Sequence, residues 1–569
     1  MEYSCSNKGG SYKVLQCLLP FWTPLIPPQA LTQLKGFVEA HSSHVVKTVD
    51  FNVMDIFREL YHKYFNTLKG FVPHDKKGNF YNVGHDVLQN HMMAHFNHGG
   101  NIETYIELVK LTIYENYFYS ITKEQVEVLN KILDEIYLEI ENKLISFMET
   151  VKPQVVGFTA YIHTLPAVIY GCSFLKNKYP HIKTLIGGGI FIWQLTPGSP
   201  DFEYFLQKTK NYIDKIFIGT GQFLFLKYLN GELPEDKRVY TTKDIEEVLD
   251  YSNFVLPDHS DLNIEYYPYL AISGSTSCPN KCSFCSISNY YGEYRKKEPE
   301  QAVNEITKLK NRHNRRLFFM LDSLINPIVT DLSKELINKN TSIYFDGYFR
   351  VDDDSGNDDN TLLWRKAGFY RARIGIESGS QRILDLMGKD ITLDQSRASL
   401  KALASAGIKT TTFWLIGHPG ETEEDFQMTL NFLEELKDYI YEAEYNPFYY
   451  FYTNQAHTDQ WFDKAVLLYH EKYRDMVISQ TWVLSCEPSR EEVFERINRF
   501  EEHRIRQGIP NPYTMEEIHQ ADKRWKRLHR NAVPSLVEVE QGLNLDERKH
   551  VKKMNIASKL KFDDIVFDF

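Results

Sequence analysis

The chain of 569 residues has only seven cysteines, and three of them fall within residues 278–285. So low a count excludes a disulfide framework, which small secreted proteins use where their hydrophobic core is too small. The hydrophobic content of 43% is enough for a sizeable core. The length predicts two or more domains. These features favour an intracellular enzyme in the reducing cytoplasm.

Long apolar runs and an excess of positive charge are also missing. The longest apolar stretches, such as residues 14–22, are much shorter than a membrane span. Residues 1–5 show no basic segment leading into an apolar one, so no signal peptide is expected. The formal net charge of −11 disfavours a nucleic-acid partner. We therefore expect a cytoplasmic protein without a membrane or nucleic-acid partner.

Strands and helices alternate in the first 250 residues, and glycines follow several of the strands. Examples are the strand at 155–158 and the glycine turns at 187–189 and 219–221. This pattern predicts a doubly wound, Rossmann-like parallel sheet, whose ligands bind at the carboxyl ends of the strands. Neither turn forms G-x-G-x-x-G, which disfavours a nicotinamide site. The glycines could serve a cofactor or simply form tight turns.

Residues 52–150 interrupt this alternation and predict a helical insertion. The helix predicted from Thr122 to Met148 has apolar residues at spacings of three and four, which make one buried stripe. Thr122 is positioned to cap its amino terminus. We assign residues 1–250 to one domain with this insertion and residues 251–267 to a linker.

Repeated strand–helix units continue through residues 268–440 and predict a partial (β/α)6 barrel. Active sites in such barrels form at the carboxyl ends of the strands. An aromatic run at 445–452 could close the edge of this barrel. Residues 441–569 are predicted to be mainly helical and to cover the substrate.

The three clustered cysteines, Cys278, Cys282 and Cys285, have the spacing C-x3-C-x2-C. Structural zinc sites use four ligands and usually pair C-x2-C units. Iron–sulfur clusters are normally held by four thiolates, so a trio leaves one iron open to a substrate or cosubstrate. The spacing therefore favours a catalytic iron–sulfur cluster over zinc.

These cysteines and several later segments together resemble the radical S-adenosylmethionine (SAM) superfamily. The elements that carry the resemblance are Asn289–Arg295 after the cysteines, Leu321–Ser323, Arg350–Asp352, Arg373–Ser380 and Ile416–Thr422. The resemblance covers roughly residues 268–440. It implies a [4Fe–4S] cluster on Cys278, Cys282 and Cys285, whose fourth iron binds SAM.

The resemblance also implies a chemistry and a set of SAM contacts. Reductive cleavage of SAM gives a 5′-deoxyadenosyl radical that takes hydrogen from a substrate. The residues implied to contact SAM are Phe284, Asp322, Arg350, Glu377 and Ser378. The implied partners are a small-molecule or peptide substrate and an electron donor such as flavodoxin or ferredoxin.

The N-terminal half is similar to the cobalamin-binding-type domain that precedes many radical SAM barrels. Candidate cobalamin contacts are Thr159, Gly187, Gly188, Gly219 and Gly221. Thr220 and Gln222 depart from the G-E-G-E that is usual there. The chain also lacks D-x-H-x-x-G, the motif that supplies a cobalt-binding histidine in other cobalamin proteins. The domain could bind cobalamin without a histidine, or have lost it.

Three functions follow from these resemblances. The leading hypothesis is cobalamin-dependent methyl transfer to an unactivated carbon. The first alternative is radical epimerisation, cyclisation or rearrangement, with a peptide as one candidate substrate and Cys486 as a hydrogen donor. The second alternative is a non-catalytic iron–sulfur protein, which the SAM-contact elements disfavour.

Overall fold

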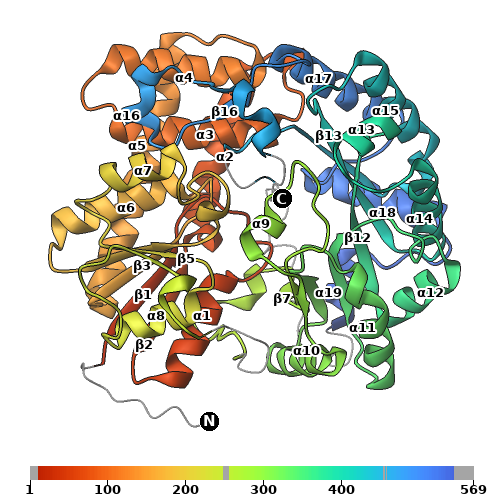
Figure 1. The fold of residues 1–569 in the computed structure, drawn as a ribbon, viewed down its shortest axis with the longest axis horizontal. Helices are drawn as coiled ribbons and strands as arrows, with labels where there is room; N and C mark the ends of the chain where they lie inside the picture. The colour runs from red at the N-terminus through yellow and green to blue at the C-terminus, as the bar shows by residue number, and fades with distance from the viewer. Residues whose placement is uncertain (1–10, 248–254, 453–454, 456–457, 544–569) are drawn as a thin grey trace.

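The structure is a computed structural model, and it describes residues 11–247, 255–452, 455 and 458–543. Two lobes lie side by side, the N-terminal lobe in red to yellow and the barrel in green to blue (Figure 1). Residues 251–254 of the expected linker and the last 26 residues of the expected C-terminal region lie outside the described residues.

The N-terminal lobe contains a six-stranded parallel sheet in the order β2-β1-β3-β4-β5-β6. Its strands are β1 (Lys13–Leu18), β2 (Val45–Asp50), β3 (Val155–Thr159), β4 (Lys183–Gly187), β5 (Lys215–Ile218) and β6 (Val239–Thr241). Its helices are α1 (Gln29–His41), α6 (Leu165–Lys178), α7 (Pro200–Lys208) and α8 (Gly221–Leu229). The strand order reverses between β1 and β3, where doubly wound sheets bind ligands. The predicted Rossmann-like fold is confirmed.

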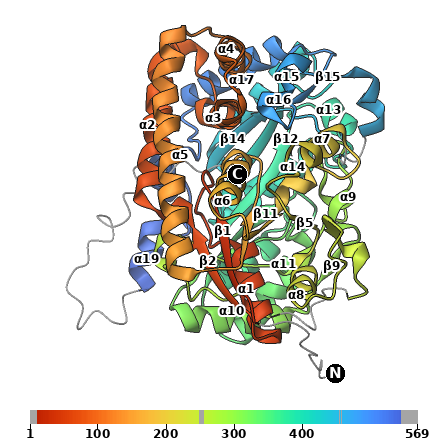
Figure 2. The same ribbon diagram turned by 90° about the vertical axis from the view of Figure 1, so that its left-hand side faces the viewer.

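The helical insertion between β2 and β3 has four α-helices. They are α2 (Asp55–Phe71), α3 (Phe80–Asn97), α4 (Ile102–Tyr117) and α5 (Lys123–Val151). Thr122 caps α5 as predicted: its side chain accepts from the backbone N–H of Gln125, whose own side chain accepts from the backbone N–H of Thr122. Helices α2 and α5 run side by side (Figure 2).

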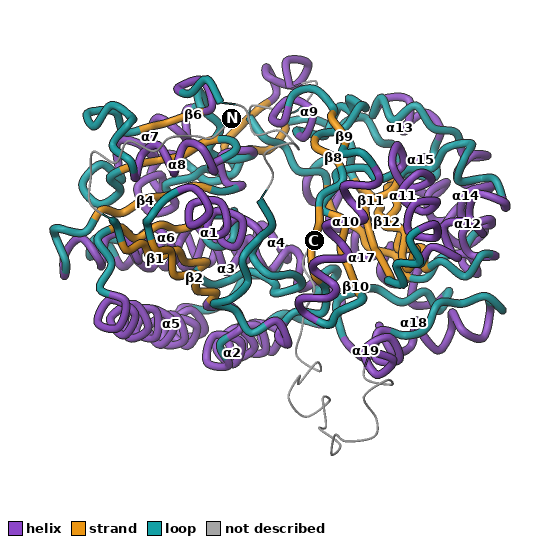
Figure 3. Tube along the Cα trace, turned by 90° about the horizontal axis from the view of Figure 1, so that it is seen from below, coloured by secondary structure: helices purple, strands orange, loops and turns teal. Residues whose placement is uncertain are grey.

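The second lobe contains another six-stranded parallel sheet, in the order β7-β10-β11-β12-β13-β14. Its strands are β7 (Leu270–Ile272), β10 (Leu317–Met320), β11 (Tyr344–Phe349), β12 (Phe369–Glu377), β13 (Lys409–Ile416) and β14 (Glu442–Pro447). The helices between them are α10 (Pro299–His313), α11 (Asn326–Asn338), α12 (Asp358–Ala367), α13 (Gln381–Leu386), α14 (Leu393–Ser405) and α15 (Glu423–Glu435). Because β14 belongs to this sheet, the sheet extends past residue 440, where the barrel was expected to end. The aromatic run at 445–452 begins within β14. Figure 3 shows both sheets in orange, with helices flanking them.

The C-terminal region packs on the barrel and reaches back to the helical insertion. It contains a short hairpin, β15 (Ala465–Leu467) and β16 (Trp482–Leu484), and the helices α16 (Arg474–Val477), α17 (Arg490–Arg506), α18 (Met515–Leu528) and α19 (Leu536–Leu543). Lys472 pairs with Glu107 of α4 at 2.9 Å, and the side chain of Asn97 donates to the carbonyl of Met476 at 3.3 Å. This region thus joins the two lobes. None of the described helices is long and apolar enough to cross a membrane.

A buried ion network crosses the interior of the barrel. Asp346 of β11 accepts from Nε of Arg371 at 2.7 Å and from Nε of Arg373 at 2.8 Å. Asp346 and Arg373 have no exposed side-chain area. Burial opposes the charge of Asp346, yet the two guanidinium groups keep the pKa of its carboxyl below the ordinary value. The carboxylate holds β11 and β12 in register and offsets two buried cations.

Replacing Asp346 with Asn should therefore destabilise the barrel. The amide keeps the size of the side chain but leaves two buried guanidinium groups without their shared anion, a loss of about 3–5 kcal/mol. Differential scanning calorimetry should show a clearly lower Tm. The control is Asp331→Asn, which removes an exposed pair with Lys334 at 3.8 Å and should leave the Tm nearly unchanged. Equal Tm values for the two variants would show that the network does not stabilise the barrel.

Candidate functional site

The three clustered cysteines lie in one loop between the short strand β8 (Ser275–Thr276) and helix α9 (Ile287–Tyr291). Cys282 is buried, and Cys278 and Cys285 are half-buried. Burial, with smaller contributions from the charges of Cys282 and Cys278, raises the pKa of Cys285 to about 11. The three sulfurs are therefore close enough to interact through their charges.

The donors around these sulfurs suit a cluster that spreads over several irons. Nδ2 of Asn280 donates to Sγ of Cys278 at 3.6 Å, and Nη1 of Arg350 donates to Sγ of Cys282 at 3.7 Å. Hydrogen bonds to cysteine sulfurs are one of the means by which proteins tune iron–sulfur clusters. Within the described ranges, no three His, Cys, Asp or Glu residues lie where they could hold a single metal ion. In a [4Fe–4S] cluster, by contrast, each cysteine ligand binds a different iron.

Two anchors hold the cysteine loop against the barrel. Asp322, directly after β10, accepts from the backbone N–H of Gly274 at 2.9 Å and from the hydroxyl of Ser275. The backbone N–H of Ser283 donates to the carbonyl of Met387 at 2.8 Å. The first anchor holds the residues just before the loop, and the second holds the loop itself. The segment after β10 and the end of α13 therefore determine where the cysteines lie.

A cavity of about 310 Å³ opens beside the loop, at the carboxyl ends of β11 to β14. Its walls are mostly aromatic, with two carboxylates and one amide. The lining residues are Phe284, Tyr348, Glu377, Phe413, Trp414, Leu415, Glu444, Asn446, Pro447, Tyr449 and Phe451. Such a mixture, largely apolar with a few polar groups, is typical of a small-molecule site.

The end of β12 contributes the polar centre of this cavity. Glu377 adopts a left-handed backbone conformation, with φ of 66°. Its Oε1 accepts from Nζ of Lys389 at 2.7 Å, and Lys389 lies 5.7 Å from the ring centre of Phe284. Strained backbone of this kind is concentrated at functional sites. Glu377 and Phe284 therefore line the same cavity.

Two other residues expected to contact SAM are enclosed by protein. Ser378 is completely buried; its hydroxyl accepts from the N–H of Ser380 at 3.1 Å and lies 3.1 Å from Oγ1 of Thr429. Asp322 is also completely buried, with both carboxylate oxygens bonded to the loop. Neither residue is among those that line the cavity. Both lie behind its wall, where they hold neighbouring segments in place.

The carboxyl edge of the N-terminal sheet faces the cysteine loop. The backbone of Gly219, after β5, lies near the hydroxyl of Tyr290 in α9. Trp193, after β4, stacks on Phe451 of the large cavity with ring centres 6.1 Å apart. The two sheets thus direct their carboxyl ends toward the same region.

The candidate cobalamin contacts lie along this edge of the sheet. Gly188 has φ of 110°, and a Cβ there would approach the carbonyl of Ala160 to 2.6 Å. Gly219 has φ of 101°, and its Cβ would approach Thr242 to 2.8 Å. The turns themselves require these two glycines, whatever ligand binds. The other candidates are Thr159, buried at the end of β3, Gly187, the last residue of β4, and Gly221, the first residue of α8.

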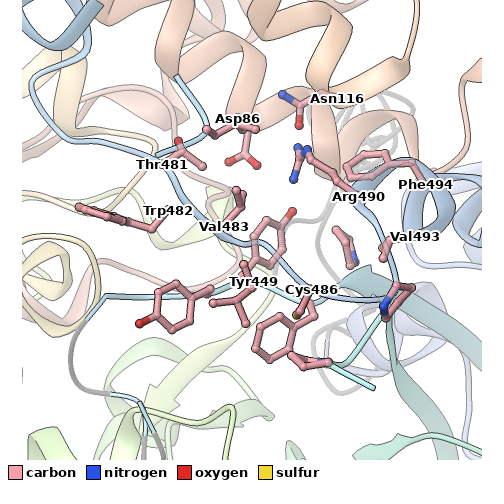
Figure 4. A pocket seen from close by; sticks show the side chains of 18 of the residues that line it. Asp86, Asn116, Tyr449, Thr481, Trp482, Val483, Cys486, Arg490, Val493 and Phe494 are labelled. Carbon is pink, nitrogen blue, oxygen red and sulfur yellow. The ribbon is translucent and has the colours of Figure 1, made fainter. Parts of the chain in front are cut away.

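Cys486 lies in a second, smaller cavity of about 70 Å³ (Figure 4). The cavity is enclosed by α3 and α4 of the insertion, the hairpin of β15 and β16, and the segment after β14. Pro447 and Tyr449 line both this cavity and the larger one. Asp86, Asn116 and Arg490 are among its polar lining residues. The sequence did not point to these three because they are far apart along the chain and belong to no shared motif.

Sequence comparison identifies residues 272–433 as matching the Radical SAM superfamily. A similar protein is the anaerobic magnesium-protoporphyrin IX monomethyl ester cyclase of Rubrivivax gelatinosus, which is 25% identical over 51% of this chain. The chain spans 55% of the length of that cyclase. An uncharacterized methyltransferase of Pyrococcus horikoshii is 24% identical over 56% of this chain and 72% of its own length.

Structure comparison extends the likeness to both lobes. The cobalamin- and [4Fe–4S]-bound radical SAM methyltransferase TsrM of Kitasatospora setae superposes with a TM-score of 0.52. The superposition covers 81% of each chain at 13% sequence identity. At that identity the likeness establishes the shared fold, an N-terminal parallel sheet followed by a barrel.

The buried carboxyl of Asp322 should make stability depend on pH. Burial raises its pKa to about 6, against the lowering effect of its bonds to Gly274 and Ser275. The folded protein thus holds this proton more tightly than the unfolded chain. The resulting stabilisation is complete below the ordinary pKa near 3.8 and is lost as the pH rises through about 6.

Asp322→Asn should remove this dependence. The Tm of the wild type minus that of the variant should fall as the pH rises from about 4 to about 7, because only the wild type acquires a buried charge. Differential scanning fluorimetry across this range measures the difference. Exposed Asp359→Asn is the control and should give a flat difference. A flat difference for Asp322→Asn would mean that its pKa is not raised.

Proposed function

Because residues 272–433 make this chain a member of the radical SAM superfamily, we propose that it is an enzyme that activates substrate C–H bonds. The observation that carries the proposal is the position of the cysteine loop beside the 310 Å³ cavity at the carboxyl end of the barrel. A purely structural cluster would have no need of a cavity at this place. We assign the [4Fe–4S] cluster to Cys278, Cys282 and Cys285, and SAM to the cavity.

The cluster, when bound, supplies the electron that cleaves SAM to methionine and a 5′-deoxyadenosyl radical. The chain's own residues orient and enclose the reactants. Arg350 and Asn280 place hydrogen-bond donors at two cysteine sulfurs. The carbonyl of Phe284 accepts from Nε2 of Gln455 at 3.1 Å, which fixes the loop against the segment after β14.

We assign the polar groups of the cavity to the polar parts of SAM, and its aromatic groups to the adenine. Glu377 is the carboxylate that accepts hydrogen bonds from the polar groups of SAM, and Lys389 holds its side chain in place. Phe284, Tyr348 and Phe413 supply apolar surface for the adenine and exclude water. Arg350, whose Nη1 donates to Sγ of Cys282 at 3.7 Å, is assigned to the SAM carboxylate, because a guanidinium matches a carboxylate. Ser378 and Asp322 act behind this wall, by holding β12 and the cysteine loop.

The reaction that we favour is cobalamin-dependent methyl transfer. The support is the fold of the N-terminal lobe, whose carboxyl edge faces the cysteine loop through Gly219 and Trp193. A bound cobalamin would supply the methyl carrier. The likeness to a cobalamin-bound methyltransferase and to an uncharacterized methyltransferase agrees with this assignment.

A second candidate is radical epimerisation, cyclisation or rearrangement without a methyl carrier. Cys486 favours it, because its thiol lines the small cavity that adjoins the SAM cavity through Tyr449. A thiol in that position could return a hydrogen atom to a substrate radical. The similarity to a cyclase also fits this reaction. For either reaction we propose a small-molecule or peptide substrate, a flavodoxin- or ferredoxin-type electron donor, and a cytoplasmic location.

Removing one cysteine of the loop should abolish SAM cleavage. We expect Cys282→Ala, after anaerobic reconstitution, to lose most absorbance near about 400 nm and to form no 5′-deoxyadenosine, because the cluster loses a ligand. Mass spectrometry of the products from SAM and reductant measures the cleavage. Cys172→Ala, which removes a buried thiol in α6, is the control and should retain it. Cleavage by Cys282→Ala at the wild-type rate would refute the assigned cluster site.

Methyl transfer makes a separate prediction about cobalamin. Reconstituted protein should retain about one cobalamin per chain after gel filtration, and turnover should yield S-adenosylhomocysteine beside 5′-deoxyadenosine. The cobalamin spectrum and product chromatography measure the two results. If 5′-deoxyadenosine forms but cobalamin is never retained, methyl transfer is wrong and the second candidate is favoured.

A further inference from the structure

The 70 Å³ cavity has a polar end and an apolar end. Asp86 and Asn116 from the insertion and Arg490 from the start of α17 lie together on one side (Figure 4). Thr481, Cys486, prolines and aromatic and aliphatic side chains form most of the rest of the wall. A water needs about 10–15 Å³ by this measure, so the space holds about five waters. That volume suits the head group of a ligand rather than a whole aromatic molecule.

Arg490 is held so that one edge of its guanidinium can bind a ligand. Its Nε and Nη2 donate to the carbonyl of Glu115 at 3.1 and 2.9 Å, and its plane lies 4.7 Å from the ring centre of Phe494. Its Nε also lies 3.3 Å from Oε2 of Glu115, so that edge already has a carboxylate partner. Nη1 has no hydrogen-bond partner in the part of the chain that the structure describes. A guanidinium that is fixed on one edge and open at Nη1 can donate a hydrogen bond to the carboxylate of a ligand.

Asn116 and Asp86 offer hydrogen-bond acceptors to the cavity, whereas Arg490 offers donors. The Nδ2 of Asn116 donates to the carbonyl of Thr112 at 2.9 Å, so the amide presents its oxygen, which is a hydrogen-bond acceptor. Asp86 adds a carboxylate to the same side of the cavity. Acceptors of this kind suit an ammonium group, whereas Arg490 suits a carboxylate. The three residues together complement a head group that carries both charges.

We propose that this cavity binds the α-amino carboxylate head group of the substrate. The proposal rests on the function proposed above and names the substrate class of that site. Arg490 holds the carboxylate, and Asp86 and Asn116 receive the ammonium group. The rest of the substrate extends past Pro447 and Tyr449, which both cavities share, toward the SAM cavity. The helical insertion thereby becomes part of the substrate site.

Binding of a short amino acid tests the proposal without any chemistry. Saturation-transfer NMR on the full chain, without SAM or reductant, would compare L-alanine with L-alaninamide and with ethylamine. L-alanine should bind the wild type, and the two probes that lack a carboxylate should bind at least about tenfold more weakly. Arg490→Gln should weaken L-alanine about tenfold or more. Arg506→Gln, an exposed change in the same helix, should leave binding unchanged.

The outcomes separate this inference from the proposed function. If L-alanine and L-alaninamide bind the wild type equally, or if neither binds, the inference is wrong; this comparison does not depend on a variant folding. Unchanged binding in Arg490→Gln would overturn it too. If L-alanine binds as expected but the reconstituted protein never forms 5′-deoxyadenosine, the proposed function fails and the head-group site stands.

Discussion

Parallel strand pairing is the constraint on which the rest of this structure depends. In each six-stranded sheet all strands point the same way, so every carboxyl end and the turn that follows it lie at one edge. In the barrel this edge gathers Asp322, Arg350 and Glu377, which are far apart along the chain. Because the carboxyl edge of the N-terminal sheet faces the same region, the two lobes can act on a common site.

The cysteine loop depends on this arrangement for its position. It has little regular structure of its own, and its anchors come from barrel strands and the helices that follow them. Asp322 shows what such an anchor costs: burial of its carboxyl raises the pKa and disfavours the charged form. In return, Asp322 holds Gly274 and Ser275, the residues that lead into the cysteine loop. Deeper in the barrel, Asp346 compensates two buried guanidinium groups. The two carboxyls differ in effect: the pKa of Asp322 is raised, so its charge costs stability, whereas the pKa of Asp346 is lowered and its charge stabilises the barrel.

The C-terminal region and the helical insertion complete the site from outside the barrel. Arg490 lies at the start of α17, and Asp86 and Asn116 lie in α3 and α4. These elements meet because the C-terminal region crosses from the barrel to the insertion, where Lys472 and Asn97 form contacts between them. The insertion therefore does more than pack on the N-terminal sheet. It supplies one wall of a cavity that adjoins the larger one through Tyr449.

The sequence alone determined what is local or repeated. Hydrophobic periodicity predicted the sheets, the barrel and the capped helix at Thr122, because strand and helix patterns are written in neighbouring residues. The spacing of the three cysteines indicated an iron–sulfur site, and later motifs indicated Glu377 and Phe284. Only the tertiary structure decided that Ser378 and Asp322 are enclosed behind the cavity wall. Only the tertiary structure brought Asp86, Asn116 and Arg490 together. Contacts between distant segments depend on how whole helices and strands pack, and they produce no recognisable spacing of residues along the chain.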